Sequence, residues 1–370
     1  MKNGEQKKND ANRGSQEERL QYECEQAFLR RTYTEPSVEE EWKRFQRELP
    51  RDVAPAQQSS RTTAFRYWLY GAASVAAVVV ALFLWMRGGA TESDDTLTLF
   101  AAPVEELSVT LEEQLAETGE TCRTEIAPQT SSRAIRNGAV ITPRQADYTH
   151  LTTDRVTTTT LYIPCGQVYK VILNDGTEVW LNANSRLIYP VRFAGNKRKV
   201  RLEGEAYFKV ARNERMPFVI ETETLTTEVL GTEFNVKSYK ESQTHVTLVN
   251  GSVRVGMPSL GKTVILEPGE EITYAEKGYQ VKKVDTAYYT QWREGYFYFD
   301  DFYLSDILKD LGRWYNVTIA MEKDSLLLNQ KLHFVAERNE DIDQVIENLN
   351  AFSYLSASKQ GNKVMIKRKK

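Results

Sequence analysis

The sequence lacks the residue patterns on which most enzymes and metal proteins depend. It contains only three histidines, His150, His245 and His333, and none belongs to an HExxH pattern. No CxxC pair and no nucleophile elbow occurs, and we assign no phosphate-binding loop. These absences argue against a metallohydrolase, a redox enzyme or a serine hydrolase, and we expect neither a cofactor nor a metal ion.

An excess of charge of one sign is also missing. Lys and Arg number 48 and Asp and Glu number 51, so no broad positive field is present to attract nucleic acid. The one local excess is the terminal KVMIKRKK, which we interpret as a solvated basic tail. We therefore predict no direct contact with nucleic acid.

Long apolar runs are absent except for one. Residues 67–86 read YWLYGAASVAAVVVALFLWM and carry no charge. Twenty helical residues at about 1.5 Å each span the hydrocarbon core of a bilayer, which is roughly 30 Å thick. Trp68, Tyr70 and Trp85 lie near its ends, where aromatic rings settle at lipid headgroups. A long polar region precedes the run, which is unlike a signal peptide. A buried core helix is the alternative, and we predict a transmembrane helix.

The flanking charges predict its orientation, because Lys and Arg are retained on the cytoplasmic side. Four arginines lie in the twenty residues before the run, whereas only Arg87 lies in the twenty after it. We therefore expect an inner-membrane protein with a cytoplasmic N-terminus and an outer, periplasmic region from about residue 88. Cys122 and Cys165 would then share an oxidising space, where they form a disulfide or remain two thiols.

Residues 1–66 are predicted to form a short helical tail and a linker. Val38, Trp42, Phe45 and Leu49 fall on one face of a helix that begins at a Ser37-xx-Glu40 capping box. A helical tail of this size is too small to bury a core of its own. The apolar stripe therefore binds a partner protein, packs within the tail or lies on the membrane surface.

The outer region divides into segments with different sequence patterns. Residues 87–160 are irregular with some β-type stretches, and 161–290 carry short strand-like runs separated by turn signals, which predicts an all-β domain. NDG at 174–176 predicts a β-hairpin, and Asn250-Gly251 and Pro268-Gly269 predict further turns.

Residues 295–370 change to a β-α-β order, which is repeated once. The apolar positions of the first helix recur 38 residues later in the second, which favours a small α+β domain with split β-α-β topology. The five matching pairs are Leu304 and Ile342, Ile307 and Val345, Leu308 and Ile346, Leu311 and Leu349, and Trp314 and Phe352.

Particular stretches resemble one protein family. VILNDGTEVWLNANSRLIYP, VRLEGEAYFKVARNERMPFVI, VLGTEFNVKSY and VTLVNGSVRV, between about 170 and 255, are similar to the periplasmic domain of FecR-type anti-sigma factors. FDDFYLSDILKDLGRWYNVTI resembles the domain that follows it, which is related to the signalling (STN) domain of secretins and TonB-dependent transporters. PSVEEEWKRF is similar to the tail that such proteins present to an extracytoplasmic-function (ECF) sigma factor.

The resemblance implies a transmembrane regulator of transcription. A TonB-dependent transporter of the outer membrane would contact the periplasmic region, most naturally 295–370, and residues 1–66 would bind the ECF sigma factor. The alternatives are a membrane-anchored structural or assembly protein and a glycan-acting enzyme. For the enzyme, Glu203 and Glu205 would share one face of a strand as an acid–base pair, although a solvent-facing or structural role explains these glutamates better.

The resemblance also implies a possible reaction of the chain on itself. Some FecR-like regulators are cut at a Gly-Thr bond in the periplasmic domain, and Gly231-Thr232 occupies the matching place. The Thr hydroxyl would attack the preceding carbonyl and give an ester that water opens. The alternative is that Gly231 permits a bulge or close strand packing and that Thr232 is an ordinary strand residue.

Overall fold

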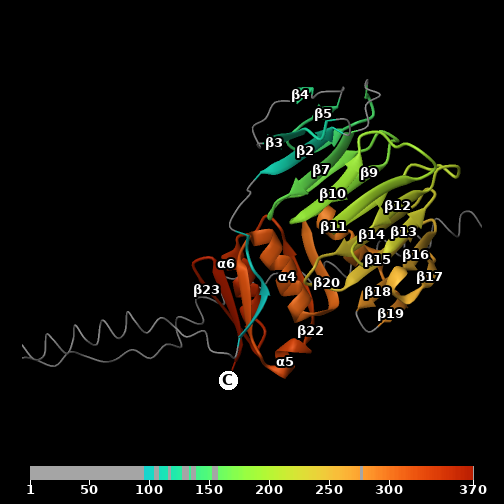
Figure 1. The fold of residues 1–370 in the computed structure, drawn as a ribbon. Coiled ribbons are helices and arrows are strands. Elements are labelled where there is room, and N and C mark those ends of the chain that lie inside the picture. The colour runs from blue at the N-terminus through green and yellow to red at the C-terminus, as the bar shows by residue number, and fades with distance from the viewer. Residues whose placement is uncertain are drawn as a thin grey trace, which may run out of the picture. The chain divides into compact units, whose positions relative to one another are not determined.

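The structure is a computed structural model that describes residues 96–103, 108–115, 118–126, 133–134, 139–151, 157–275 and 278–369. All of these residues belong to one compact unit that begins at Gly89 (Figure 1). The predicted tail and linker, 1–66, and the predicted span, 67–86, lie outside the described residues. Within the part of the chain that the structure describes, no helix is long and apolar enough to cross a bilayer.

Strands β2 to β19 form two sheets, which we call the sandwich. The first sheet has the order β3-β2-β7-β10-β11-β12-β13-β16-β17, and the second β4-β5-β6-β8-β9-β11-β14-β15-β18-β19. The strands in chain order are β2 (Val109–Leu115), β3 (Thr121–Ile126), β4 (Arg133–Ala134), β5 (Val140–Ile141), β6 (Gln145–Asp147), β7 (Thr157–Ile163), β8 (Tyr169–Ile172), β9 (Glu178–Leu181), β10 (Ser185–Pro190), β11 (Arg198–Lys209), β12 (Phe218–Glu221), β13 (Thr226–Val229), β14 (Glu233–Ser238), β15 (Thr244–Asn250), β16 (Val253–Met257), β17 (Lys262–Leu266), β18 (Glu270–Ala275) and β19 (Gly278–Lys283). The predicted all-β fold is therefore present, and it already includes strands of the 87–160 segment.

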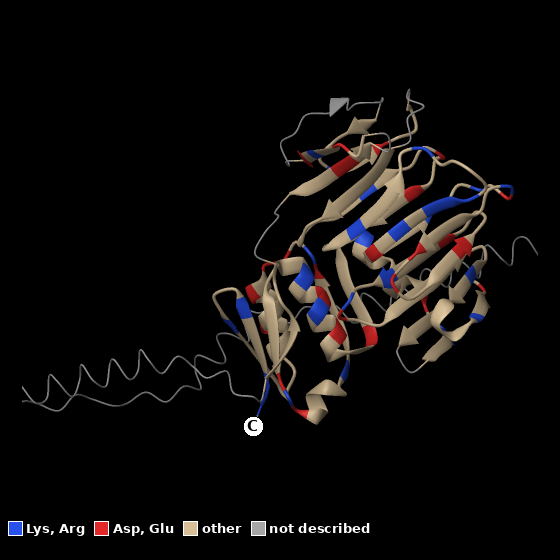
Figure 2. Ribbon diagram, viewed as in Figure 1, with Lys and Arg blue, Asp and Glu red and all other residues tan. Residues whose placement is uncertain are grey.

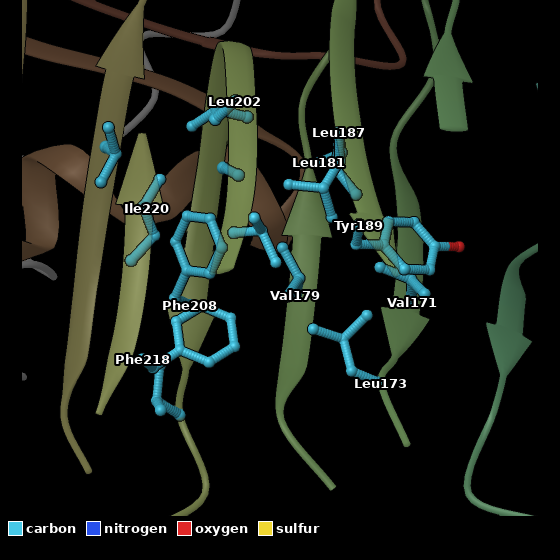
Figure 3. Packing of buried hydrophobic residues seen from close by; sticks show 14 of the residues in the cluster. Val171, Leu173, Val179, Leu181, Leu187, Tyr189, Leu202, Phe208, Phe218 and Ile220 are labelled. Carbon is cyan, nitrogen blue, oxygen red and sulfur yellow. The ribbon is translucent and has the colours of Figure 1, made fainter. Parts of the chain in front are cut away.

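One apolar core holds the two sheets together. Strands such as β7 and β10 alternate buried and more exposed residues, as expected for strands with one face toward a core. Phe208 lies beside Phe218 (Figure 3). It also stacks on Phe234 at a centroid distance of 5.3 Å, and all three rings are completely buried. Since each fully buried side chain of this size contributes about 1.5–3 kcal/mol, these contacts stabilise the sandwich strongly.

Strand β11 belongs to both sheets and changes sheet at Gly204. Its first half pairs with β10 and β12, and its second half pairs with β9 and β14. Gly204 has φ +108°, and a Cβ there would lie 2.4 Å from the Ser185 hydroxyl oxygen. Only glycine fits this crossing, because a side chain would be both strained and obstructed.

The predicted turns are present, but they serve different connections. Residues 174–176 close the antiparallel hairpin β8–β9, with Gly176 at φ +83°, as the NDG pattern predicts. Asn250-Gly251 instead connects β15 of the second sheet to β16 of the first, and Pro268-Gly269 connects β17 to β18 in the same manner. These two turns carry the chain between sheets, so their flanking strands do not pair with each other.

The residues after the sandwich form the C-terminal module, which has the predicted α+β order. Its elements are η2 (Thr286–Tyr289), η3 (Gln291–Glu294), β20 (Tyr296–Tyr303), α4 (Leu304–Tyr315), β21 (Thr318–Glu322), α5 (Ser325–Leu328), β22 (Lys331–Glu337), α6 (Ile342–Asn350), β23 (Leu355–Gln360) and β24 (Lys363–Arg368); the remaining short helix, η1 (Pro258–Leu260), belongs to the sandwich. The apolar faces of α4 and α6 pack into a second core, separate from that of the sandwich. Strands β20 and β22 form a two-stranded sheet.

The second sheet of the C-terminal module contains a strand from the other end of the described chain. Its order is β1-β21-β24-β23, and β1 (Thr96–Phe100) pairs antiparallel with β21. In Figure 1 the cyan β1 lies among the orange and red elements of this module. We predicted residues 87–160 as a segment of their own, and no local pattern in TLTLF indicates a partner more than 200 residues away.

Candidate functional site

The residues predicted to bind a sigma factor, Val38, Trp42, Phe45 and Leu49, lie outside the described residues, so that site stays a prediction. The described chain offers a different candidate, the contact between the sandwich and the C-terminal module. We call it the junction and define it by these residues: Asn182, Glu205, Asn235, Lys237, Tyr239, Glu241, Trp292, Asp310, Arg313 and Arg338. Figure 2 shows acidic and basic positions interspersed over the strands and helices around it.

Arg313 is the central residue of the junction. It lies in the last turn of α4, and its side chain is only 3 % exposed. Its guanidinium donates hydrogen bonds to Asp310 one turn earlier and to Glu241 of the sandwich, and it lies 3.8 Å from the ring centroid of Tyr239. Burial alone would lower the pKa of Arg313, but the Asp310 carboxylate and the nearby Tyr239 and Glu241 raise it above its usual value. Arg313 therefore stays charged and joins the two modules.

Asp310 bridges Arg313 to a lysine of the sandwich. Its second carboxylate oxygen accepts a 2.6 Å hydrogen bond from the Lys237 ammonium. Burial raises the pKa of Asp310, but Lys237 and Arg313 more than offset that effect and lower it to about 2. The three groups form a continuous ion-pair network across the junction.

A second group of hydrogen bonds runs beside the first. The Glu205 carboxylate accepts hydrogen bonds from the side-chain amides of Asn182 at 2.8 Å and Asn235 at 2.9 Å. The Asn182 side-chain oxygen accepts a 2.8 Å hydrogen bond from Arg338 of the C-terminal module, and that of Asn235 accepts one from the Trp292 indole. Burial lowers the pKa of Arg338. Glu205 therefore holds two amides that present their oxygens to the other module.

These contacts suit the junction to holding two modules together. Its acidic and basic side chains are equal in number, Glu205, Glu241 and Asp310 against Lys237, Arg313 and Arg338. Removing one partner of a buried ion pair typically costs 3–5 kcal/mol, because the other charge is left buried and unpaired. A cavity of about 70 Å³ remains beside the network, lined partly by Glu205, Trp292 and Arg338.

The prediction that Glu203 and Glu205 share one face of a strand is wrong. Glu205 is 5 % exposed and belongs to the junction, whereas Glu203 is half-buried and lies near Arg186 and Arg201. The positive φ of Gly204 between them interrupts the alternation of side chains along β11. The two carboxylates therefore do not form an acid–base pair.

Gly231 and Thr232 lie where the chain passes from β13 of the first sheet to β14 of the second. A Cβ at Gly231 would lie 2.7 Å from both Cα and Cβ of Arg212, so close packing explains the glycine. The Thr232 hydroxyl is buried and donates a 3.0 Å hydrogen bond to the Ser252 carbonyl. A peptide carbonyl is not a base, so this hydroxyl is not activated for attack in the conformation described.

The structure holds Cys122 and Cys165 as free thiols, which is one of the two alternatives that the sequence leaves open. Cys122 is exposed on the outer strand β3, whereas Cys165 packs against the core of the C-terminal module. Burial raises the pKa of the Cys165 thiol to about 11. A disulfide between these cysteines is expected only because both would lie in the same oxidising compartment. The fold puts the two residues in different surroundings.

The three histidines lie apart. His150 is exposed in a turn, His245 lies 3.6 Å from Glu271 and His333 lies 3.2 Å from Asp300. Within the described ranges, no three His, Cys, Asp or Glu side chains come together as metal ligands.

One further motif in the sequence does not have the structure that its letters suggest. GMPSLGKT at 256–263 has the letters of a phosphate-binding loop. Such a loop joins a strand to a helix, whose N-terminus holds the phosphate. Here the stretch joins the antiparallel strands β16 and β17 through η1, with strand β17 in place of the helix. The residues therefore form a hairpin connection.

Comparison with known proteins identifies both modules. A model of the FecR protein family matches residues 154–254, and a model of the FecR C-terminal domain matches residues 296–366. Two crystal structures of a candidate anti-sigma factor from Parabacteroides distasonis, at 1.65 Å and 2.50 Å resolution, are 29 % and 30 % identical to this chain, each with a TM-score of 0.53. They cover 57 % and 58 % of this chain and 99 % and 100 % of their own. No curated protein matches the chain.

Proposed function

Because the chain belongs to the FecR family of anti-sigma factors, we propose that it relays a signal from an outer-membrane TonB-dependent transporter to a cytoplasmic ECF sigma factor. A sigma factor is the partner that the family implies. The transporter and the ECF class of the sigma factor belong to our proposal.

The junction is the observation that supports a relay. It connects the two family-matched regions through buried ion pairs, so a contact on one module acts on the other. Lys237 and Glu241 of the sandwich hold Asp310 and Arg313 of α4. Arg313 is buried, Lys237 and Asp310 are largely buried, and Glu241 is one-third exposed. A partner that binds one module thereby changes the free energy of the other.

Each part of the chain then belongs to one compartment. Residues 1–66 lie in the cytoplasm, 67–86 cross the inner membrane once, and the residues from about 88 onward lie in the periplasm. The asymmetry of arginines around 67–86 supports this orientation. The protein works by binding, and cleavage at Gly231-Thr232 stays a separate prediction.

Sigma binding is assigned to the helical stripe of Val38, Trp42, Phe45 and Leu49. An amphipathic helix of this kind lays its apolar face into a groove of its partner, with the large aromatic side chains as anchors. Trp42 and Phe45 are the two aromatic residues of the stripe.

The test replaces Trp42 and Phe45 together by Ala in the full chain. We expect the co-expressed sigma factor to escape capture on the tagged variant and sigma-dependent transcription to rise, because the two anchors are lost. Arg44→Ala with Arg47→Ala, on the opposite face of the predicted helix, is the matched control and should leave capture unchanged. Undiminished capture by the aromatic variant would contradict the proposal. A periplasm-dependent reporter fused after residue 370 should be active in every strain.

A further inference from the structure

Strand β1 is the first described element after the predicted span, and it completes the C-terminal module. Leu97 pairs with Met321, Thr98 with Ala320 and Phe100 with Ile319 across β1 and β21. Just beyond the strand, the Ala102 N–H donates a 3.1 Å hydrogen bond to the Thr318 hydroxyl. Nine positions, 87–95, separate the span from this strand.

The strand is fixed by the side chain of Phe100, which packs into a space beside Gly312 and Arg313 of α4 that we call the Phe100 seat. Leu99 and Phe100 are 7 % and 6 % exposed and belong to the core of the C-terminal module. Phe100 lies over Gly312 of α4, where an added Cβ would come within 2.7 Å of the ring. A glycine in the interior of a helix costs about 1 kcal/mol of stability relative to alanine. Gly312 therefore makes room for Phe100 but makes helix α4 less stable.

The seat of β1 adjoins the junction. The residue after Gly312 is Arg313, whose guanidinium lies 5.9 Å from the ring centroid of Phe100 and 3.8 Å from that of Tyr239. The same guanidinium pairs with Glu241 of the sandwich. One side chain thus contacts β1, α4 and the sandwich.

We propose that β1 is a releasable strand whose docking on the C-terminal module depends on the junction. While the sandwich holds Arg313, the wall of the Phe100 seat stays in place and β1 stays paired with β21. When a partner separates the two modules, Arg313 moves, the seat opens and β1 leaves the sheet. The chain next to the span is then free of the module, which is the change that the proposed relay needs; this part rests on the proposed function.

The first experiment measures hydrogen exchange of the full chain in detergent. Glu241→Gln weakens the hold on Arg313 without contacting β1. We expect amides of residues 96–103 to exchange about tenfold faster or more, as for loss of a charge-assisted hydrogen bond, while α6 stays protected. Asp343→Asn, which breaks the exposed pair with Lys359, is the control and should change nothing. Wild-type protection of 96–103 in Glu241→Gln would overturn the proposal.

The second experiment tests the consequence in cells that carry a reporter for the sigma factor. Phe100→Ala empties the seat, and we expect the reporter to rise severalfold without any inducer. Leu97→Ala, on the exposed side of the same strand, should leave it at the wild-type level. Fast exchange of 96–103 in Phe100→Ala without a change in the reporter would overturn the link to signalling. If deletion of residues 1–66 also leaves the reporter unchanged, the proposed function itself fails.

Discussion

At the scale of single residues, close packing and self-cleavage require different properties of the residues at the Gly231-Thr232 bond. The packing of Arg212 against Gly231 requires a glycine whether or not the bond is cut. Cleavage requires in addition that the Thr232 hydroxyl leave the Ser252 carbonyl and approach the Gly231 carbonyl carbon. The two explanations therefore differ in what they predict for Thr232 and agree on Gly231.

If the family resemblance extends to self-cleavage, purified chain should yield a fragment that begins at Thr232. The hydroxyl oxygen bonds to the Gly231 carbonyl carbon, the peptide C–N bond breaks, and water opens the ester to leave a Gly231 carboxylate and a free Thr232 amine. We expect Thr232→Ala to stay uncut and Thr232→Ser, which keeps a hydroxyl, to be cut. N-terminal sequencing identifies the fragment. A wild-type chain that remains intact contradicts this prediction.

At the scale of elements, the two-stranded sheet β20–β22 is the part of the C-terminal module that offers most exposed aromatic and apolar surface. Tyr296, Tyr303 and Val335 are 41–45 % exposed on it, and among the described residues β22 pairs only with β20. A strand with an unpaired edge can accept a strand from another protein. This sheet is therefore our choice for the transporter contact.

Val335→Glu should abolish induction by the transporter's substrate, because it puts a charge on the proposed contact. Capture of the sigma factor should remain as in the wild type. The matched control is Ile265→Glu on β17, where an apolar side chain is 61 % exposed on the sandwich instead. Normal induction in Val335→Glu, or equal loss in both variants, would place the contact elsewhere.

The elements predicted best from the sequence are those whose signals are local. The 3.6-residue spacing of Leu304, Ile307, Leu308 and Leu311 predicts α4 and its buried face, and all four are buried. The junction was not predictable, because Asp310 and Arg313 look like an ordinary surface pair at i, i+3. Their burial depends on Lys237 and Glu241, more than 70 residues away in the sequence. Ion pairs between residues so far apart produce no periodic pattern in the sequence.

At the scale of the whole molecule, the junction should make stability depend on pH in acid. The pKa of Asp310 is about 2 in the folded chain against its ordinary 3.8, so its contribution is present above about pH 4 and is lost as pH falls to 2. A difference of this size corresponds to about 2 kcal/mol. The free energy of unfolding of the unit from Gly89 onward, measured with denaturant, should fall between pH 5 and pH 2. The fall should exceed that of a variant without the carboxylate by this amount.

Asp310→Asn is that variant. At pH 7 it should be less stable by about 3–5 kcal/mol, since Lys237 and Arg313 lose a buried partner, and its stability should change less in acid. Asp343→Asn, at an exposed ion pair, should follow the wild-type pH dependence. Parallel acid profiles for Asp310→Asn and the wild type would show that the carboxylate does not act in this way.

The pairing of β1 with β21 also fixes the order of events while the protein is being made. β1 precedes its partner by more than 200 residues, so it is synthesised long before the strand that will receive it. At a synthesis rate of about 5–20 residues per second, the wait lasts on the order of ten to forty seconds. During that time the sandwich can close, but Leu99 and Phe100 have no core to enter. The part of the described chain that is made last therefore buries the strand that is made first.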